Sequence, residues 1–577
     1  MDINRSTLHT TPLFRSPSTV MSPARLGAMH QTRLSFVRTL LRKIASQHWQ
    51  VDVKEWHLCP RGFGHVIYRL CTPNHVYHFV AFCNEIADEE RNDRVIAEKW
   101  DVTFALIEGD ITAELMTQLR DNVPRQEAGR NSNKVLVLAR ANKSVRVFDH
   151  IIDQLAKGSQ PNPKELAEAG YILRTTAVYG NGKFGIADFK RLENNPDFSQ
   201  SFSAQMCAVY LLREFSLAWV NYLSAQQGGD HSIGLHPDLQ RYLGVGNATG
   251  LGMAPYLISH PAIVDQWMTT RETALASVLS QQVCHEKIRS LNALLNKAIL
   301  HLTQIVTVNE RQQSLNREAV DNLSALTLDL NSIVTPNHDW HPLLEHSKCM
   351  SFEAQEVILT CLLELYPNLV DQYQEQMNCS ETLDLPSGKS VGDLIKALEK
   401  KYHWAISTDF SKPQNNYWFW YRSEDKEEPR LGVRGEENGE EKELPLDVAR
   451  QAHHLYKALL ISSPETPLAE FLLQHPQHRS IARRTWTLSQ KVMGDIQMNV
   501  LHESALPIHL LRCKLANFGA TKFDPRSDRW VRVTFYQGAP LLTDLHDPSY
   551  HDNWVFPLLP EQKDLQPVKT SRQGDAL

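Results

Sequence analysis

Residues 51–83 read VDVKEWHLCPRGFGHVIYRLCTPNHVYHFVAFC. This stretch decides the fold of the N-terminal part of the chain. Runs rich in β-branched and aromatic residues alternate with two turn sequences, PRG at 60–62 and TPNH at 72–75. Short runs of this composition, separated by proline, glycine and asparagine, are typical of β-hairpins. The stretch therefore predicts a three-stranded antiparallel meander.

The predicted sheet continues after the meander. Residues 102–109 (VTFALIEG) and 134–140 (KVLVLAR) have the same β-rich character, and helices are expected near 85–99 and 112–122. Before the meander, residues 33–48 carry apolar side chains at helical spacing. The basic face of this helix is expected to be solvated.

Helix dominates the rest of the chain. Long apolar-periodic segments predict a helix over 204–226 and two or three helices over 262–333. Towards the C-terminus, residues 404–410 and 416–423 resemble paired strands, and 530–537 predicts a closing strand. The fold class is therefore mostly α with α+β parts: an N-terminal antiparallel-sheet domain, a central helical domain and a C-terminal α+β domain. The predicted boundaries are a disordered tail at 1–31, domains at 32–150, 151–335 and 336–559, and a loose tail at 560–577.

Composition limits the classes of function. The net charge of -6 gives no basic excess for a wide nucleic-acid or membrane surface. Nine scattered cysteines without a CxxC pair fit a reducing compartment. The N-terminus has no long apolar core typical of a secretory signal, and no apolar run approaches a membrane span. A cytoplasmic protein without nucleic-acid or membrane partners is expected, and a homo-oligomer is compatible with the sequence.

Three segments combine glycines with polar or charged side chains, a pattern that allows close backbone approach to a ligand. The first, residues 174–185, contains GNGKFG at 180–185. Arg174, Asn181 and Lys183 are its candidate anion ligands. It lacks the spacing and the Ser or Thr of a phosphate-binding P-loop. A tight turn between two helices is the alternative interpretation.

The second segment, GVGNATGLGMAP at 244–255, supplies Asn247 and Thr249. Its glycine spacing does not match a dinucleotide-binding motif, and a helix is expected before it. Close approach to a ligand and close packing of a helix are equally compatible with it. The third segment, residues 514–530, supplies Lys522, Arg526 and Arg529 around a predicted Asp-Pro-Arg-Ser turn. A solvated, salt-bridged turn is the alternative there.

No established catalytic motif accompanies these segments. HExxH and GxSxG are absent, no metal site is predicted, and no cofactor is indicated. Asp188 and Glu214 are acid–base candidates only because they lie near the first segment. The acidic stretch 423–443 is expected to be an exposed, mobile loop.

The three glycine-containing segments resemble those of an uncharacterised bacterial protein family. The resemblance implies a bacterial cytosolic origin, and it implies no activity and no site residue. From the residues themselves, the sequence predicts a cytoplasmic enzyme acting on a small anionic metabolite of the carboxylate, phosphate or acyl-CoA type, held between these Gly-rich loops. A non-catalytic helical interaction or scaffold protein is the alternative.

Overall fold

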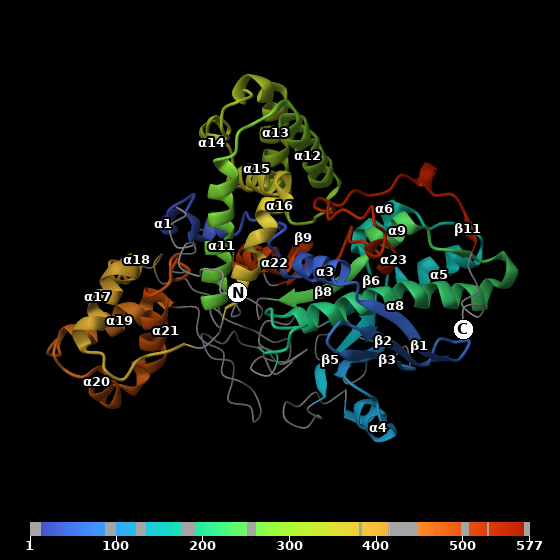
Figure 1. The fold of residues 1–577 in the computed structure, drawn as a ribbon, viewed down its shortest axis with the longest axis horizontal. Helices are drawn as coiled ribbons and strands as arrows, with labels where there is room; N and C mark the ends of the chain where they lie inside the picture. Colours follow the sequence, from blue (N-terminus) through green and yellow to red (C-terminus); the bar gives the residue numbers. More distant parts are fainter. Residues whose placement is uncertain are drawn as a thin grey trace. The chain divides into compact units, whose positions relative to one another are not determined.

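The protein is described from a computed structural model (Figure 1). The structure describes residues 13–86, 100–122, 134–175, 192, 194–250, 261–379, 383–412, 415, 448–497, 507–527 and 530–569.

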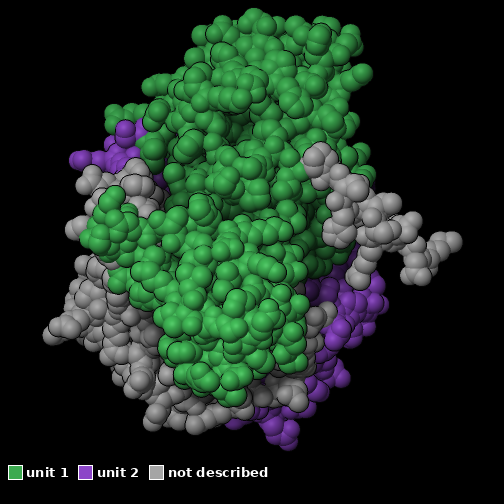
Figure 2. Space-filling view, turned by 90° about the vertical axis from the view of Figure 1, so that its left-hand side faces the viewer, with its two compact units in different colours: residues 1–34, 250–296, 315–517 green, residues 35–249, 297–314, 518–577 purple. Residues whose placement is uncertain are grey.

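The chain divides into two compact units, coloured separately in Figure 2, and each is discontinuous in sequence. The unit called here the helical unit comprises residues 1–34, 250–296 and 315–517. The sheet unit comprises residues 35–249, 297–314 and 518–577.

One nine-stranded sheet organises the sheet unit, in the order β1-β2-β3-β4-β5-β6-β8-β10-β9. Its strands are β1 (Gln50–Leu58), β2 (Gly64–Cys71), β3 (Val76–Cys83), β4 (Val102–Glu108), β5 (Val135–Lys143), β6 (Tyr171–Thr175), β8 (Gly244–Gly250), β9 (Ala520–Ser527) and β10 (Trp530–Phe535). Neighbours from β1 to β6 are antiparallel, and β6 and β8 are parallel. The predicted meander, β4, β5 and the strand at 530–535 are confirmed.

Helices cover both faces of this sheet. The long helix α8 (Ser203–Gly228) contacts β3 to β6 on one face, with α3 (Phe36–Ser46) and α5 (Phe148–Ala156) packed against it. On the other face, Leu115 and Leu119 of α4 (Ala113–Asn122) pack on Ile67, Phe82 and other strand residues. Burial of apolar side chains on both faces stabilises the sheet.

Smaller elements complete the sheet unit. They are α6 (Pro163–Ala169), η3 (Gly229–His231), β7 (Ile233–Gly234), α9 (Pro237–Tyr242), α23 (Leu542–Leu545), η8 (Gln562–Asp564) and β11 (Val568–Lys569). In α6, Asn162 caps the first turn, Pro163 begins the helix, and Gly170 ends it at φ 79°. Glycine adopts this left-handed conformation without the steric penalty of a Cβ.

Among its described residues, the helical unit consists of helices and connecting segments, with an isolated β-bridge between Ser390 and Pro467. The helices are α1 (Pro17–Val20), α2 (Pro23–Leu26), α11 (Pro261–Leu279), α12 (His285–Gln304), α13 (Glu310–Ile333), α14 (His341–Ser347), α15 (Phe352–Leu365), α16 (Pro367–Val370), η5 (Asp371–Met377), α17 (Val391–Lys401), α18 (His403–Ile406), α19 (Val448–Leu460), α20 (Leu468–Gln474), η7 (Pro476–His478), α21 (Arg479–Ser489) and α22 (Pro507–Phe518). Residues 297–314, at the end of α12 and the start of α13, belong to the sheet unit. None of the described helices combines the length and apolar character that crossing a membrane requires.

The structure corrects the predicted domain boundaries. β5 and β6 pair across the boundary at 150, and β9 and β10 join the sheet from the C-terminal region. The predicted tail at 1–31 is wrong from residue 13 onwards, because Val20 and Leu26 are fully buried. These errors share one cause: contacts distant in sequence leave no local pattern.

Three local predictions are also wrong. Residues 403–406 form α18 instead of a strand. The second glycine segment is not a loop, because residues 244–250 form β8. The basic face of α3 is not solvated, because Arg38 and Arg42 form ion pairs with Asp552. The predicted helix at 85–99, apart from its first two residues, the strand at 416–423 and the acidic loop at 423–443 lie outside the described residues.

Candidate functional site

A buried carboxylate and a histidine meet at the turn between β2 and β3. This turn is the predicted TPNH sequence, and Thr72 closes it: its Oγ accepts the backbone N–H groups of Asn74 and His75 at 3.1 and 2.9 Å. The Thr72 N–H donates to the His75 carbonyl at 2.9 Å. The turn therefore holds the backbone of His75 in place.

Asp197 accepts four side-chain hydrogen bonds from this turn and from β3. Its Oδ1 accepts from Asn74 Nδ2 at 2.8 Å. Its Oδ2 accepts from Thr72 Oγ at 2.8 Å, Tyr77 Oη at 2.9 Å and His75 Nδ1 at 3.1 Å. The Asp197 side chain is fully buried, so these donors replace water as its partners.

The environment keeps Asp197 ionised. Burial alone would raise the pKa of this carboxyl, but the hydrogen bonds from Asn74, Thr72, His75 and Tyr77 outweigh burial and lower it. An ionised carboxylate only accepts hydrogen bonds, so His75 Nδ1 carries the proton of their shared bond.

The segment that carries Asp197 is itself fixed on both sides. Asn195 Oδ1 accepts the backbone N–H groups of Asp197 and Phe198 at 2.8 and 3.0 Å. Lys43 of α3 donates through Nζ to the carbonyl oxygens of Pro196 and Asp197 at 2.6 and 2.9 Å. The carboxylate is thus rigidly placed, as a group that orients a histidine must be.

His75 also borders a pocket of about 230 Å³. The pocket is lined by His75, Glu108, Leu192, Asn194, Asn195 and Pro196. His75 Nε2 lies 3.9 Å from Glu108 Oε1, and the His75 side chain is 38% exposed. With Nδ1 protonated towards Asp197, Nε2 of the neutral ring has a lone pair that accepts protons.

This arrangement is suited to proton transfer. A carboxylate on Nδ1 fixes the tautomer and orientation of an imidazole and stabilises its protonated form. The Nε2 of an imidazole held in this way can remove a proton from a neighbouring group and return it. Glu108 offers a carboxylate on the other side of His75.

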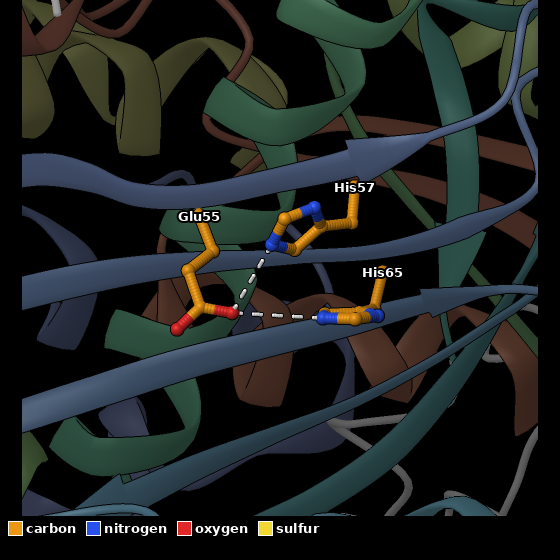
Figure 3. A group of neighbouring side chains, drawn as sticks. All are labelled: Glu55, His57 and His65. Carbon is orange, nitrogen blue, oxygen red and sulfur yellow. Dashed lines mark ion pairs between the residues drawn. The ribbon is translucent and has the colours of Figure 1, made fainter.

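A different group of side chains lies at the opposite end of β2. Glu55, His57 and His65 place one potential metal-ligand atom each within 4.8 Å of one another (Figure 3). Burial, followed by the charges of His57 and Arg120, lowers the pKa of His65.

The predicted ligand residues are distributed over neighbouring strands. Arg174 of β6 lies opposite Gly246 of β8, and Thr175 lies opposite Asn247, which is buried. Thr249 lies in β8, but its side chain is outside the described residues, as are Asn181, Lys183, Asp188 and Arg529. The structure therefore brings Arg174 and Asn247 to adjacent strands, within one sheet that also contains residues 520–527 of the third segment.

Lys522 and Arg526 have structural partners. The Lys522 ammonium is buried and donates to the carbonyl oxygens of Ala167 and Glu168, at the end of α6, at 2.6 and 3.3 Å. Arg526 Nε lies 2.9 Å from Asp524 Oδ2. The expected Asp-Pro-Arg-Ser turn is part of strand β9, so Lys522, Asp524 and Arg526 share one strand face. The carboxylate of Asp524 therefore provides a counter-charge within the strand for Lys522 and Arg526.

Glu214, the other acid–base candidate, also has a structural partner: its Oε1 accepts from Arg213 Nη1 at 2.9 Å. In the sequence, the TPNH turn marks only a strand boundary, and neither His75 nor Asp197 stands out as a site residue. A polar turn containing histidine was the available signal, but 122 residues separate it from its carboxylate.

Comparisons with protein-family models, curated proteins and solved structures gave no match for this chain.

Proposed function

We propose that this protein is an enzyme in which His75 acts as a general acid–base on a small polar substrate bound in the pocket beside it. The observation that carries the proposal is the 3.1 Å contact between His75 Nδ1 and the buried carboxylate of Asp197. It leaves Nε2 as the proton acceptor at the pocket. Asp197 is the positioning residue, and Glu108 is a second polar contact for the substrate.

The prediction of a small anionic metabolite stays a prediction, as do a bacterial origin and a cytoplasmic location. Arg174 lies opposite Gly246 and Asn247 opposite Thr175, so alternation directs the side chains of Arg174 and Asn247 to opposite faces of the sheet, and this pair gives the anion-binding role no support. The alternative of a helical interaction protein also stays open. Exposed Leu460, Ile461 and Leu473 in the helical unit favour it.

The test starts from a ligand screen on the full chain by thermal shift, followed by turnover assays on compounds that stabilise it. His75→Asn is the informative variant, because its amide N–H₂ can still donate to Asp197 while the base is lost. We expect turnover to fall about 100-fold or more, as it does when a general base is removed.

His231→Asn is the matched control, since His231 is an exposed histidine of the same unit. We expect it to retain wild-type turnover. If His75→Asn turned over every hit compound as fast as the control, the proposed role of His75 would be wrong.

A further inference from the structure

We propose that Glu55, His57 and His65 bind a divalent transition-metal ion, with Zn²⁺ as the ion that fits them best. The site goes beyond the proposed function and does not depend on it. His65 lies at the start of β2 and His75 in the turn after its end, so about 20 Å of strand separates the two sites.

The donor atoms already have nearly the spacing of a tetrahedral site. Glu55 Oε2 lies 3.6 Å from His57 Nε2 and 3.7 Å from His65 Nε2. Bonds of about 2.0–2.1 Å to a tetrahedral zinc ion place neighbouring donors roughly 3.4 Å apart. Small side-chain rotations therefore suffice to close the three donors on one ion.

Strand pairing creates this spacing. His57 of β1 lies directly opposite His65 of β2, and Glu55 precedes His57 by two residues on the same face. Figure 3 shows the three side chains converging from the two strands. Neither histidine belongs to a recognised sequence motif, so the sequence alone indicated no metal site.

A glycine fixes this register. Gly64 pairs with Leu58 and has φ 138°. A Cβ at residue 64 would lie 1.9 Å from the carbonyl oxygen of His57. Only glycine fits at this position, so the two strands approach each other closely there. This close approach keeps His57 and His65 opposite each other.

The charges and donor types select the class of ion. Two imidazoles and a carboxylate suit zinc and its neighbours among the transition metals, whereas calcium and magnesium prefer oxygen ligands alone. Glu55 supplies one negative charge, and Arg120 of α4 is the cation that faces His65. The Arg120 charge weakens attraction for a metal cation, so we expect moderate affinity.

The exposure of the group allows an ion to enter. The side chains of His57, Glu55 and His65 are 64%, 38% and 21% exposed. Three protein ligands leave one position of a tetrahedron for water or another ligand, as in catalytic zinc sites.

The test is a Zn²⁺ titration of the metal-free full chain by calorimetry, with Glu55→Gln, His57→Asn and His65→Asn as variants. We expect the wild type to bind one zinc ion and each variant to bind it at least about 10-fold more weakly. Losing a group that only supports a ligand already lowers metal affinity by about that factor. His231→Asn controls for zinc binding by exposed histidines elsewhere and should match the wild type. Circular dichroism confirms that each variant is folded.

Co²⁺ provides a second readout, because its visible spectrum reports tetrahedral coordination. A tetrahedral spectrum in the wild type and in His231→Asn, lost in the three variants, supports the site. Equal zinc affinity in the wild type and in the three variants, or an octahedral Co²⁺ spectrum unchanged by them, would overturn the proposal.

Discussion

At the scale of single residues, Glu356 of the helical unit pairs with three arginines. Glu356 is fully buried, and its Oε1 accepts from Arg15 and Arg25 at 2.6 and 3.0 Å. Its Oε2 accepts from Arg271 at 2.7 Å. Arg15 also pairs with buried Glu272 at 2.6 Å. These ion pairs attach the N-terminal segment to α11 and α15, a role that sequence periodicity did not reveal.

Glu356→Gln should therefore reduce the free energy of unfolding by about 3–5 kcal/mol, because it leaves buried guanidinium groups without their charge partner. Urea denaturation measures this change. Glu375→Gln, at an exposed glutamate of the same unit, should change stability by less than about 0.5 kcal/mol. Equal stability of the two variants would contradict the role of Glu356.

The same glutamate gives a pH dependence. Burial alone would raise the pKa of Glu356, but the charges of Arg15, Arg271 and Arg25 hold it at about 2, below the ordinary value of 4.5. The unfolded chain therefore takes up this proton first as pH falls. The contribution of Glu356 should be complete above pH 4.5 and should be lost as pH falls from 4.5 to 2. Urea denaturation of wild type and Glu356→Gln should converge in this range; a constant difference would contradict the assignment.

His301 gives a second pH dependence, in the sheet unit. Its Nδ1 donates to the Pro557 carbonyl at 2.8 Å, and burial lowers its pKa to about 4 from 6.5. Because the unfolded chain protonates first, stability should fall by about 3 kcal/mol as pH falls from 6.5 to 4. His301→Asn should show a shallower slope in this window. An unchanged slope would show that other groups cause the loss of stability at low pH.

At the scale of elements, the C-terminal segment neutralises the basic face of α3. Asp552 lies 3.0 Å from Arg38 Nε and 2.6 Å from Arg42 Nη1. Its backbone carbonyl also accepts from Arg38 Nη2 at 2.9 Å. The helix itself was predictable from its apolar spacing. Its partner was not, because 514 residues separate Arg38 from Asp552.

Asp552→Ala should lower the free energy of unfolding by about 3–5 kcal/mol, since Arg38 is fully buried and would lose its counter-charge. The measurement is again urea denaturation. Asp564→Ala removes an exposed aspartate from the same segment and should have little effect. A comparable loss in both variants would mean that the ion pair contributes nothing specific.

At the scale of the whole molecule, local sequence patterns predicted the individual helices and strands, but they did not predict the two compact units that these elements form. The strands of the meander, α4 and α8 follow directly from alternation and helical periodicity. Three features join residues that are distant in sequence. They are the pairing of β6 with β8, the addition of β9 and β10 to the sheet, and the contact of His75 with Asp197. The candidate site was therefore missed, whereas the fold class was predicted.

This architecture predicts the outcome of truncation. A chain ending at residue 517 lacks β9 and β10, which complete the sheet after β8. We expect it to lose cooperative unfolding of the sheet unit and to be cut rapidly in β8 by proteases. The fragment 32–150 should not fold alone either, because it lacks α8, which covers the sheet. A compact, protease-resistant fragment would contradict this account.

The tautomer of His75, determined by ¹⁵N NMR on histidine-labelled protein, reports directly whether Asp197 orients this ring. His75→Asn assigns the signal, and the sample is held at a pH where the ring is neutral. We expect a proton on Nδ1, donated to Asp197, and an unprotonated Nε2. A neutral His75 with its proton on Nε2 would contradict it, because the nitrogen proposed to act as the base would have no lone pair to accept a proton.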